Sequence, residues 1–267
     1  MSNAASGKST GLVPTMGALH EGHLSLVAAS EARCDVTVVS IFVNPTQFGA
    51  GEDYDQYPRD VDGDMEKLGR VGADLVFAPA EDVVYPADHS TQIQVGPMTK
   101  SLEGRFRPHH FGGVATIVLK LFQMVPADHA FFGEKDYQQL RVVQRMASDL
   151  NIPIEVHGCP IVRDSDGLAL SSRNAYLDPD QRQDALRLSQ SLQLAGDLLG
   201  QGERDSQVII GRMREHLLAA EAVRIDYVAL ADPLTLLPVR KVEQPVVALV
   251  AARVGQTRLI DNRTLLP

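Results

Sequence analysis

The first part of the chain alternates short apolar runs with stretches of helical spacing, and this alternation is the strongest constraint on its fold. The runs at 11–14, 36–43 and 74–78 are rich in β-branched residues and apolar on both faces, which is typical of buried parallel strands. Residues 23–33 and 60–71, which lie between them, carry apolar side chains at helical spacing. The pattern predicts a βαβαβ unit with right-handed crossovers.

The pattern continues to about residue 161 and then changes. Up to that point we expect a helix at 111–125, a strand at 130–132, a helix at 137–150 and a strand at 152–156. Beyond it helices come first and strands follow. The expected elements are helices at 181–199 and 206–220 and strands at 225–230, 246–252 and 257–260. This order predicts an α/β protein with a parallel-sheet domain at 1–161 and a smaller α+β domain at 162–267.

The composition of the chain argues against some classes of partner and ligand. The formal charge of −9 argues against nucleic acid as a partner, and an anionic substrate would require the few cations to be concentrated locally. No apolar run has the length of a membrane-spanning helix, so no membrane partner is expected. Cys34 and Cys159, the two cysteines, have no metal-like spacing. We therefore expect a soluble cytoplasmic protein without a structural metal site.

Residues 14–23 read PTMGALHEGH and lie where the first strand passes into the first helix. Open α/β sheets bind ligands at the carboxyl ends of their strands, and Gly17 and Gly22 allow a ligand close to the backbone. The start of the following helix favours an anion. His20 and His23 would lie beside that anion as donors, which suits a phosphate whose charge grows during a displacement. The alternative is that one histidine caps the helix and the other is a surface residue.

Two further motifs could supply positive charge. GEKD at 133–136 follows a strand and opens a helix, so that Lys135 could meet phosphate oxygens; alternatively it is a solvated cap. LSSRN at 170–174 combines two hydroxyl groups with Arg173, which could offset the charge on a leaving group. The alternative there is a turn before an exposed arginine.

Two glutamines are candidates for binding a small polar substrate. Gln47, in NPTQF, ends the second strand with a turn, and its amide offers both a donor and an acceptor. Gln139, in KDYQQL, would lie in the first turn of the helix after GEKD. Each glutamine taken by itself is most often polar surface.

Two other stretches resemble motifs without matching them fully. GKST at 7–10 has the end of a P-loop, but the earlier glycine is replaced by Ser2 and no strand precedes it, so we interpret it as a linker. GRFRPHHF at 104–111 is a basic loop before a helix. It is either a mobile lid over an anionic ligand, which we favour, or a solvated turn.

PTMGALHEGH, NPTQF, FGEKDYQQL, LSSRN and TRLIDN together, in this order, resemble the pantoate–β-alanine ligase (pantothenate synthetase) family of the HxGH nucleotidylyltransferase superfamily. The resemblance implies a Rossmann-like N-terminal domain, a smaller C-terminal domain that closes over ATP, and a cytoplasmic homodimer. It also implies a two-step ligation: the pantoate carboxylate attacks the α-phosphorus of ATP, and β-alanine then attacks the pantoyl adenylate to give pantothenate and AMP.

The resemblance also assigns residues to substrates. His23 is implied as the proton donor, with His20, Lys135 and Arg173 supplying donor or positive character. Pantoate is implied to contact Gln47 and Gln139, and β-alanine to contact Gln47. ATP contacts are implied for Met16, Gly17, Ala18, Leu19, His20, Glu21, Gly22, His23, Gly133, Glu134, Lys135, Asp136, Val162 (near the adenine), Leu170, Ser171, Ser172 and Arg173. No side-chain cage for a metal is visible, so Mg²⁺ is expected to arrive bound to the ATP phosphates.

The chain departs from the family pattern in a few places. The first residues, MSNA, are typical of a remnant of an expression tag, and the usual leader before the first strand is expected to be missing or replaced. His109 stands where the family usually has glycine, which we expect to stiffen the 104–111 loop, and Gly112 stands where a larger polar residue is common.

Two other functions fit parts of the pattern. A nucleotidylyltransferase that transfers AMP onto a phosphorylated cofactor precursor would share the fold and the histidines. The two glutamines, with no extra basic pocket beside NPTQF, favour a polyol carboxylate instead. A non-catalytic nucleotide-binding module is the other alternative, and the presence of the histidine, lysine and arginine of the motifs argues against it.

Overall fold

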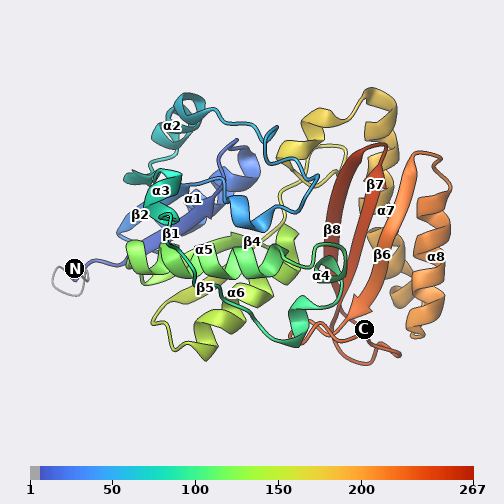
Figure 1. The fold of residues 1–267 in the computed structure, drawn as a ribbon. Helices are drawn as coiled ribbons and strands as arrows, with labels where there is room; N and C mark the ends of the chain where they lie inside the picture. Colours follow the sequence, from blue (N-terminus) through green and yellow to red (C-terminus); the bar gives the residue numbers. More distant parts are fainter. Residues whose placement is uncertain (1–6) are drawn as a thin grey trace. The chain divides into compact units, whose positions relative to one another are not determined.

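The computed structural model describes residues 7–267, which form two compact units (Figure 1). The first unit reaches to residue 134 and includes 138–161, and the second consists of 135–137 and 162–267. Residues 135–137 therefore group with the second unit, although they lie within the range of the expected first domain. The expectation about MSNA concerns residues outside the described part. Among residues 7–267, no helix is both long and apolar enough to cross a membrane.

A parallel five-stranded sheet, in the order β3-β2-β1-β4-β5, forms the centre of the first unit. Its strands are β1 (Thr10–Thr15), β2 (Val36–Ile41), β3 (Leu75–Phe77), β4 (His129–Gly133) and β5 (Glu155–Cys159). The chain moves outward from β1 to β3 and then returns to place β4 on the other side of β1. The carboxyl ends of β1 and β4 thus flank the point at which the strand order reverses, where open α/β sheets bind ligands.

Helices cover both faces of this sheet, because successive strand residues point to opposite faces and both sets are apolar (Figure 1). Leu12, Ala130 and Phe132 pack with α5 and α6 on one face. Val13 and Phe131 pack with α1 on the other. The helical segments in and beside this unit are α1 (Glu21–Glu31), η2 (Pro45–Gln47), α2 (Val61–Arg70), α3 (Glu81–Val84), η3 (Pro97–Thr99), α4 (Glu103–Phe106), α5 (His110–Met124), η4 (Glu134–Asp136) and α6 (Tyr137–Asp149). The α/β architecture expected for this part is confirmed.

Several details of the sequence prediction for this unit were wrong. The last strand begins at Glu155 rather than at residue 152, because Ile152 and Ile154 pack against the helical core before the chain joins the sheet. Leu75 was expected in a buried strand but is 59% exposed, since β3 is an edge strand with one neighbour. The helix expected at 137–150 ends one residue earlier, and Leu150, which follows it, is exposed. Thr10 of the GKST stretch already belongs to β1.

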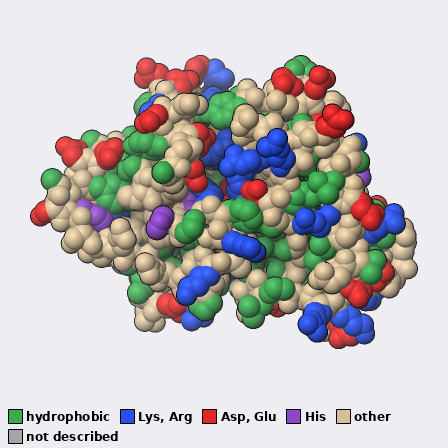
Figure 2. Space-filling view, turned by 45° about the vertical axis from the view of Figure 1, so that its right-hand side comes forward, with side chains coloured by type: hydrophobic (Ala, Val, Ile, Leu, Met, Phe, Trp, Pro, Cys, Tyr) green, Lys and Arg blue, Asp and Glu red, His purple; other side chains and the backbone are tan. Residues whose placement is uncertain are grey.

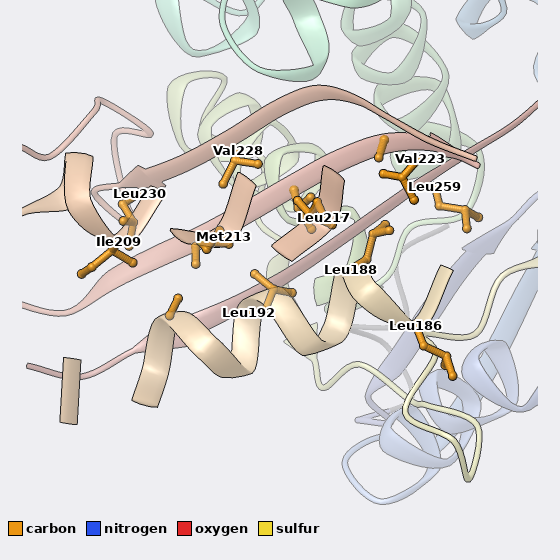
Figure 3. Packing of buried hydrophobic residues seen from close by; sticks show 14 of the residues in the cluster. Leu186, Leu188, Leu192, Ile209, Met213, Leu217, Val223, Val228, Leu230 and Leu259 are labelled. Atoms are coloured by element: carbon orange, nitrogen blue, oxygen red, sulfur yellow. The ribbon is translucent and has the colours of Figure 1, made fainter. Parts of the chain in front are cut away.

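The second unit is an antiparallel sheet in the order β6-β7-β8 with two helices packed on it. Its elements are η5 (Ser172–Tyr176), α7 (Pro179–Gly200), α8 (Ser206–Leu218), β6 (Val223–Ala231), β7 (Val246–Val254) and β8 (Thr257–Leu265). Figure 3 shows Leu188 and Leu192 from α7 pointing toward Met213 and Leu217 from α8 within one buried cluster. Each such side chain contributes about 1.5–3 kcal/mol by leaving water.

The final strand is longer than predicted. The apolar pattern suggested an end at residue 260, but β8 continues to Leu265 and pairs with β7 along its whole length. The extension reads DNRTL, and because most of its residues are polar, a prediction from hydrophobic patterns does not detect this part of the strand. Asp261 and Asn262 are nevertheless buried, which places the TRLIDN motif inside the second unit.

Candidate active site

The loop between β1 and α1 has a backbone that only particular residues tolerate. Gly17 has φ +80° and Ala18 has φ +51°, so two successive residues occupy the left-handed region. A Cβ atom on Gly17 would lie 3.0 Å from the Asp64 Oδ2 atom and 3.2 Å from the Ile41 Cγ2 atom. Glycine at this position therefore allows the chain to turn tightly between the sheet and α2.

Asp64, in the first turn of α2, fixes this loop. Its two carboxylate oxygens accept hydrogen bonds from the Ala18 and Leu19 N–H groups, each at 2.8 Å, and its exposure is only 1%. Lys67 lies 3.8 Å from Asp64 and donates to the Leu19 carbonyl at 2.8 Å. The sequence analysis did not identify Asp64, because an acidic residue in a first helical turn is ordinarily a solvated one.

Both histidines of the motif take part in capping α1. The His20 Nδ1 atom accepts from the Gly22 N–H at 3.2 Å, and the His23 Nδ1 atom accepts from the His20 N–H at 3.3 Å. Their ring centroids are 4.1 Å apart. While these bonds persist, each Nδ1 carries no hydrogen, so each neutral ring carries its hydrogen on Nε2. The capping alternative is therefore correct for His20, but His23 is half-buried and belongs to the same cap rather than to the surface. The cap also orients the Nε2–H group of each ring.

NPTQF is held next to this loop through a buried amide network. Gln47 is 9% exposed; its Oε1 atom accepts from Asn44 Nδ2 at 3.0 Å, and its Nε2 atom lies 3.0 Å from the Met16 sulfur. Asn44 also donates to the Gly113 carbonyl at 3.2 Å and accepts from the Tyr85 hydroxyl at 2.8 Å. Gln47 is thus a positioned side chain beside the histidine loop rather than polar surface. Asn44 and Tyr85 were missed, because nothing in the sequence separates them from ordinary turn and surface residues.

The 104–111 segment is anchored to the same turn. The Arg107 guanidinium forms two bonds to Glu52, at 2.6 and 2.8 Å, and a third to the Gln47 carbonyl at 3.3 Å. That carbonyl also accepts from His110 Nδ1 at 2.9 Å. The solvated-turn alternative is therefore wrong for the arginine end of this segment. Arg107 and His110 were considered only as parts of a basic loop.

The Arg107–Glu52 pair makes a pH-dependent contribution to stability. Burial opposes the charged carboxylate, but hydrogen bonds and charge from Arg107, together with the Gly49 N–H, outweigh it and lower the pKa of Glu52. A carboxyl whose pKa is lower in the folded state contributes fully above its unfolded pKa of about 4.3, and the contribution is lost as the pH falls through the folded value.

We therefore expect Glu52→Gln to lower the free energy of unfolding measurably at pH 7, with a difference from the parent chain that shrinks below about pH 4. Urea unfolding at both pH values measures this. The exposed pair Arg145–Asp149 is the control, because Asp149→Asn should change stability little at either pH. A Glu52→Gln deficit that is the same at both pH values would contradict the assignment.

Two adjacent glutamines in the first turn of α6 have different surroundings. Gln138 is buried, donates to the Met98 and Ser101 carbonyls at 2.7 and 2.9 Å, and accepts from the Glu103 N–H at 3.0 Å. These bonds hold the Gln138 side chain to the backbone of residues 98–103. Gln139 is partly exposed in the first turn of α6, so the predicted substrate residue is the one whose position leaves it accessible. Gly133 ends β4 and Glu134 begins η4 in the same unit.

In the second unit, the TRLIDN motif contacts the turn at Lys135 and the segment beside Val162. Asn262 donates to the Lys135 carbonyl at 2.9 Å, and Asp261 accepts two bonds from Arg163 at 2.7 and 2.8 Å. Arg163 lies next to Val162 in a short hairpin, closed by a bond from the Leu170 N–H to the Val162 carbonyl at 3.0 Å. TRLIDN thus holds both the Lys135 turn and the hairpin that leads to LSSRN.

LSSRN forms the start of η5. The Ser171 hydroxyl caps this helical turn by accepting from the Arg173 N–H at 3.3 Å, and Asn174 donates to the Ala169 carbonyl at 3.0 Å. Ser172 is the first residue of the turn. Ser171 therefore has a structural hydrogen bond, as the turn alternative supposed, and the same bond orders the backbone that carries Arg173.

The net charge of the chain hides local concentrations of cations. Figure 2 shows Lys and Arg side chains gathered in several groups on one face of the molecule, although the chain as a whole has a formal charge of −9. An acidic protein can therefore still offer positive potential to an anionic ligand.

Comparisons with known proteins identify the family of the chain. The family model described as pantoate-beta-alanine ligase matches residues 1–264. A pantothenate synthetase of Thermotoga petrophila is 52% identical over 258 residues, covering 97% of this chain and 92% of its own. A crystal structure of pantothenate synthetase from Thermus thermophilus has a TM-score of 0.94 at 47% identity, covering 97% of this chain and 94% of its own.

A more distant solved structure is informative about ligands. The pantoate-beta-alanine ligase of Francisella tularensis is described as complexed with beta-gamma ATP and beta-alanine. It has a TM-score of 0.79 at 32% identity and covers 96% of this chain and 89% of its own.

Proposed function

Because the chain belongs to the pantoate–β-alanine ligase family, we propose that it joins pantoate to β-alanine at the expense of ATP. Such an enzyme is a carbon–nitrogen ligase. The observation from the structure that best supports this specificity is the buried Gln47 amide, held against Met16 of the histidine loop. An uncharged donor and acceptor at that position suits the hydroxyl and carboxylate groups of pantoate better than a second phosphate.

The proposed reaction has two steps. A carboxylate oxygen of pantoate attacks the α-phosphorus of ATP, forming an acyl phosphate bond as the bond to pyrophosphate breaks. The neutral amine of β-alanine then attacks the acyl carbon and expels AMP, and the amine loses a proton. No strong base is needed for the first step, because a carboxylic acid is already ionised at neutral pH.

The first unit supplies hydrogen-bond donors for the transferring phosphate. In this proposal the segment from Met16 to His23 contacts ATP, and the Nε2–H groups of His20 and His23 donate to the charge that develops on the phosphate. His23 is the proton donor. Gln47 and Gln139 bind pantoate, and Gln47 also contacts β-alanine. The hydrogen bonds from the Ala18 and Leu19 N–H groups to Asp64 support these roles, because they fix the backbone of the loop that carries both rings.

The second unit supplies positive charge. Lys135 meets phosphate oxygens as a point charge, and Arg173 offsets charge on the leaving pyrophosphate. Asp136, Leu170, Ser171 and Ser172 of this unit also contact ATP, with Val162 near the adenine. Gly133 and Glu134, which belong to the first unit, are further ATP contacts. The bonds from Asn262 to the Lys135 carbonyl and from Arg163 to Asp261 support these roles, because they fix the backbone near both groups.

We propose that Mg²⁺ enters with the ATP phosphates. Mg²⁺ prefers oxygen ligands in octahedral geometry, which phosphates and water provide. The acidic side chain that contacts the histidine loop, Asp64, already accepts two backbone hydrogen bonds and is not arranged as part of a metal cage. We also propose, from the family resemblance, that the protein forms a homodimer in the cytoplasm.

A nucleotidylyltransferase that adds AMP to a phosphorylated precursor is the main alternative. That reaction needs a cationic pocket for the acceptor phosphate. Arg107, which donates to the Gln47 carbonyl, has its charge paired with Glu52 at 2.6 Å. Lys100 and Arg105, however, line the same pocket as Thr46 of NPTQF, so the expectation of no basic pocket beside this motif does not hold. The preference for an acceptor without phosphate therefore rests on the two glutamines.

Pantoate-dependent release of pyrophosphate from ATP tests the proposal. We expect release with ATP and pantoate alone, and formation of pantothenate and AMP once β-alanine is added. Pyrophosphate release that needs a phosphorylated acceptor would support the alternative, and ATP binding without any turnover would support a non-catalytic module.

A further inference from the structure

Two histidines and a glutamate lie together at the amino-terminal ends of β4 and β5. His129 is the first residue of β4 and pairs with Glu155, the first residue of β5. His157 follows two residues later, so its side chain leaves the sheet on the same face as Glu155. β4 runs five residues from His129 to Gly133, so roughly 13 Å of strand separates His129 from the proposed ligase site, and His157 pairs with Phe131 in the middle of β4.

The ring nitrogens and the carboxylate oxygens are already close to the spacing of metal ligands. His129 Nδ1 lies 3.0 Å from His157 Nε2 and 3.4 Å from Glu155 Oε2. One ligand atom from each of the three residues can be chosen so that all lie within 4.8 Å of one another. Two ligands that bind zinc tetrahedrally at about 2.0–2.1 Å are about 3.3 Å apart, so only small side-chain movements separate this cluster from a three-ligand site.

The surroundings hold the histidines in place. The His157 ring stacks on Phe131 with centroids 5.0 Å apart and 28° between the planes. Both histidine side chains are largely buried, at 21% and 16% exposure, while Glu155 is open to solvent at 62%.

One cation faces the cluster from the end of α1. The Arg33 Nη1 atom lies 3.6 Å from Glu155 Oε1 and 3.5 Å from His157 Nε2. Half of this side chain is exposed, so it can move into solvent. Arg33 partly neutralises Glu155 when no metal is bound and must be displaced when one is.

We propose that His129, Glu155 and His157 form a binding site for a zinc-type transition-metal ion, distinct from the ligase site. Two imidazoles and one carboxylate are a donor set for zinc, cobalt or nickel, whereas Mg²⁺ prefers oxygen ligands. The fourth position is left to water. An ion there joins the first residues of two neighbouring strands, and thereby stabilises the β5 edge of the sheet.

Zinc binding to the tag-free full chain, measured by calorimetry in the presence of excess Mg²⁺, tests the site. We expect His129→Ala and His157→Ala each to weaken binding by at least about tenfold, and zinc to raise the melting temperature of the parent chain but not of these variants. Glu155→Gln should weaken binding while leaving both rings in place. Arg33→Ala should tighten it by about two- to fivefold, because a competing cation is removed.

His89→Ala, a change of another histidine in the same unit, is the control and should bind zinc as the parent does. Pantothenate formation should be unchanged in His129→Ala, since His129 lies at the amino-terminal end of β4, opposite the proposed ligase site. Equal zinc affinity in the parent and in both His129→Ala and His157→Ala would overturn the proposal and place any bound zinc elsewhere, for example at His20 and His23. Weaker binding in Arg33→Ala would also contradict it.

Discussion

Replacement of His23 by glutamine is expected to lower pantoate-dependent pyrophosphate release by about 100-fold or more while leaving the free energy of unfolding nearly unchanged. His23 is the third residue of α1, and its Nδ1 atom accepts a hydrogen bond from the His20 N–H. Glutamine is a preferred residue at that position of a capping box, so its oxygen can take over this bond. The variant therefore removes the imidazole N–H and keeps the cap.

The same design applies to His20. Asparagine is among the best N-cap residues, so His20→Asn should keep α1 stable and still lose activity, whereas alanine would cost about 1 kcal/mol in capping. His216→Gln, in the second unit, is the matched control and should retain full activity. If His20→Asn and His23→Gln both turned over at the parental rate, the two histidines would be caps only. Pyrophosphate release and urea unfolding, measured on the same preparations, distinguish these outcomes.

The second large effect is expected at Asp64. Asp64→Ala should lower the free energy of unfolding by about 3 kcal/mol, because two charge-assisted hydrogen bonds to the Ala18 and Leu19 N–H groups are lost and those donors are left without this partner. The loop residues with positive φ lose their support at the same time. We therefore expect activity to fall sharply even at temperatures where the variant remains folded.

Asp62→Ala is the control, because Asp62 lies in the same first turn of α2 but is exposed. It should change stability by less than about 0.5 kcal/mol. Chemical unfolding and steady-state activity are the measurements. Asp64→Ala with parental stability would show that the carboxylate does not hold the loop. If the variant were less stable but kept the parental activity per folded molecule, the hydrogen bonds to Asp64 would stabilise the fold without contributing to catalysis.

The sequence predicted the layered α/β architecture because its signal is periodic and local. Runs such as Val36–Ile41 are apolar on both faces, and only a buried parallel sheet uses that pattern widely. The edge position of β3 and the late start of β5 were not predictable in this way, because strand order and register depend on contacts between distant segments. The polar end of β8 was missed for the opposite reason: its residues are buried by pairing and by specific hydrogen bonds rather than by apolarity.

The candidate site shows the same difference between local sequence signals and contacts between distant segments. His20, His23, Gln47 and Lys135 were predicted as site residues because each lies in a motif at a strand end, where the sequence itself indicates a loop over the sheet. Their supporting residues were not found. Asp64 acts on a loop 45 residues away, and Asn262 on a carbonyl 127 residues away. Such partners carry no local signature, since an isolated aspartate or asparagine has many ordinary uses.

The most direct test of the central claim follows the oxygen atoms of pantoate. Pantoate labelled with heavy oxygen in its carboxylate is incubated with ATP, β-alanine and the full chain, and the products are analysed by mass spectrometry. If the carboxylate attacks the α-phosphorus, one labelled oxygen must appear in AMP and the other must remain in pantothenate. AMP that carries no label, or label found in released phosphate, would contradict the pantoyl-adenylate mechanism.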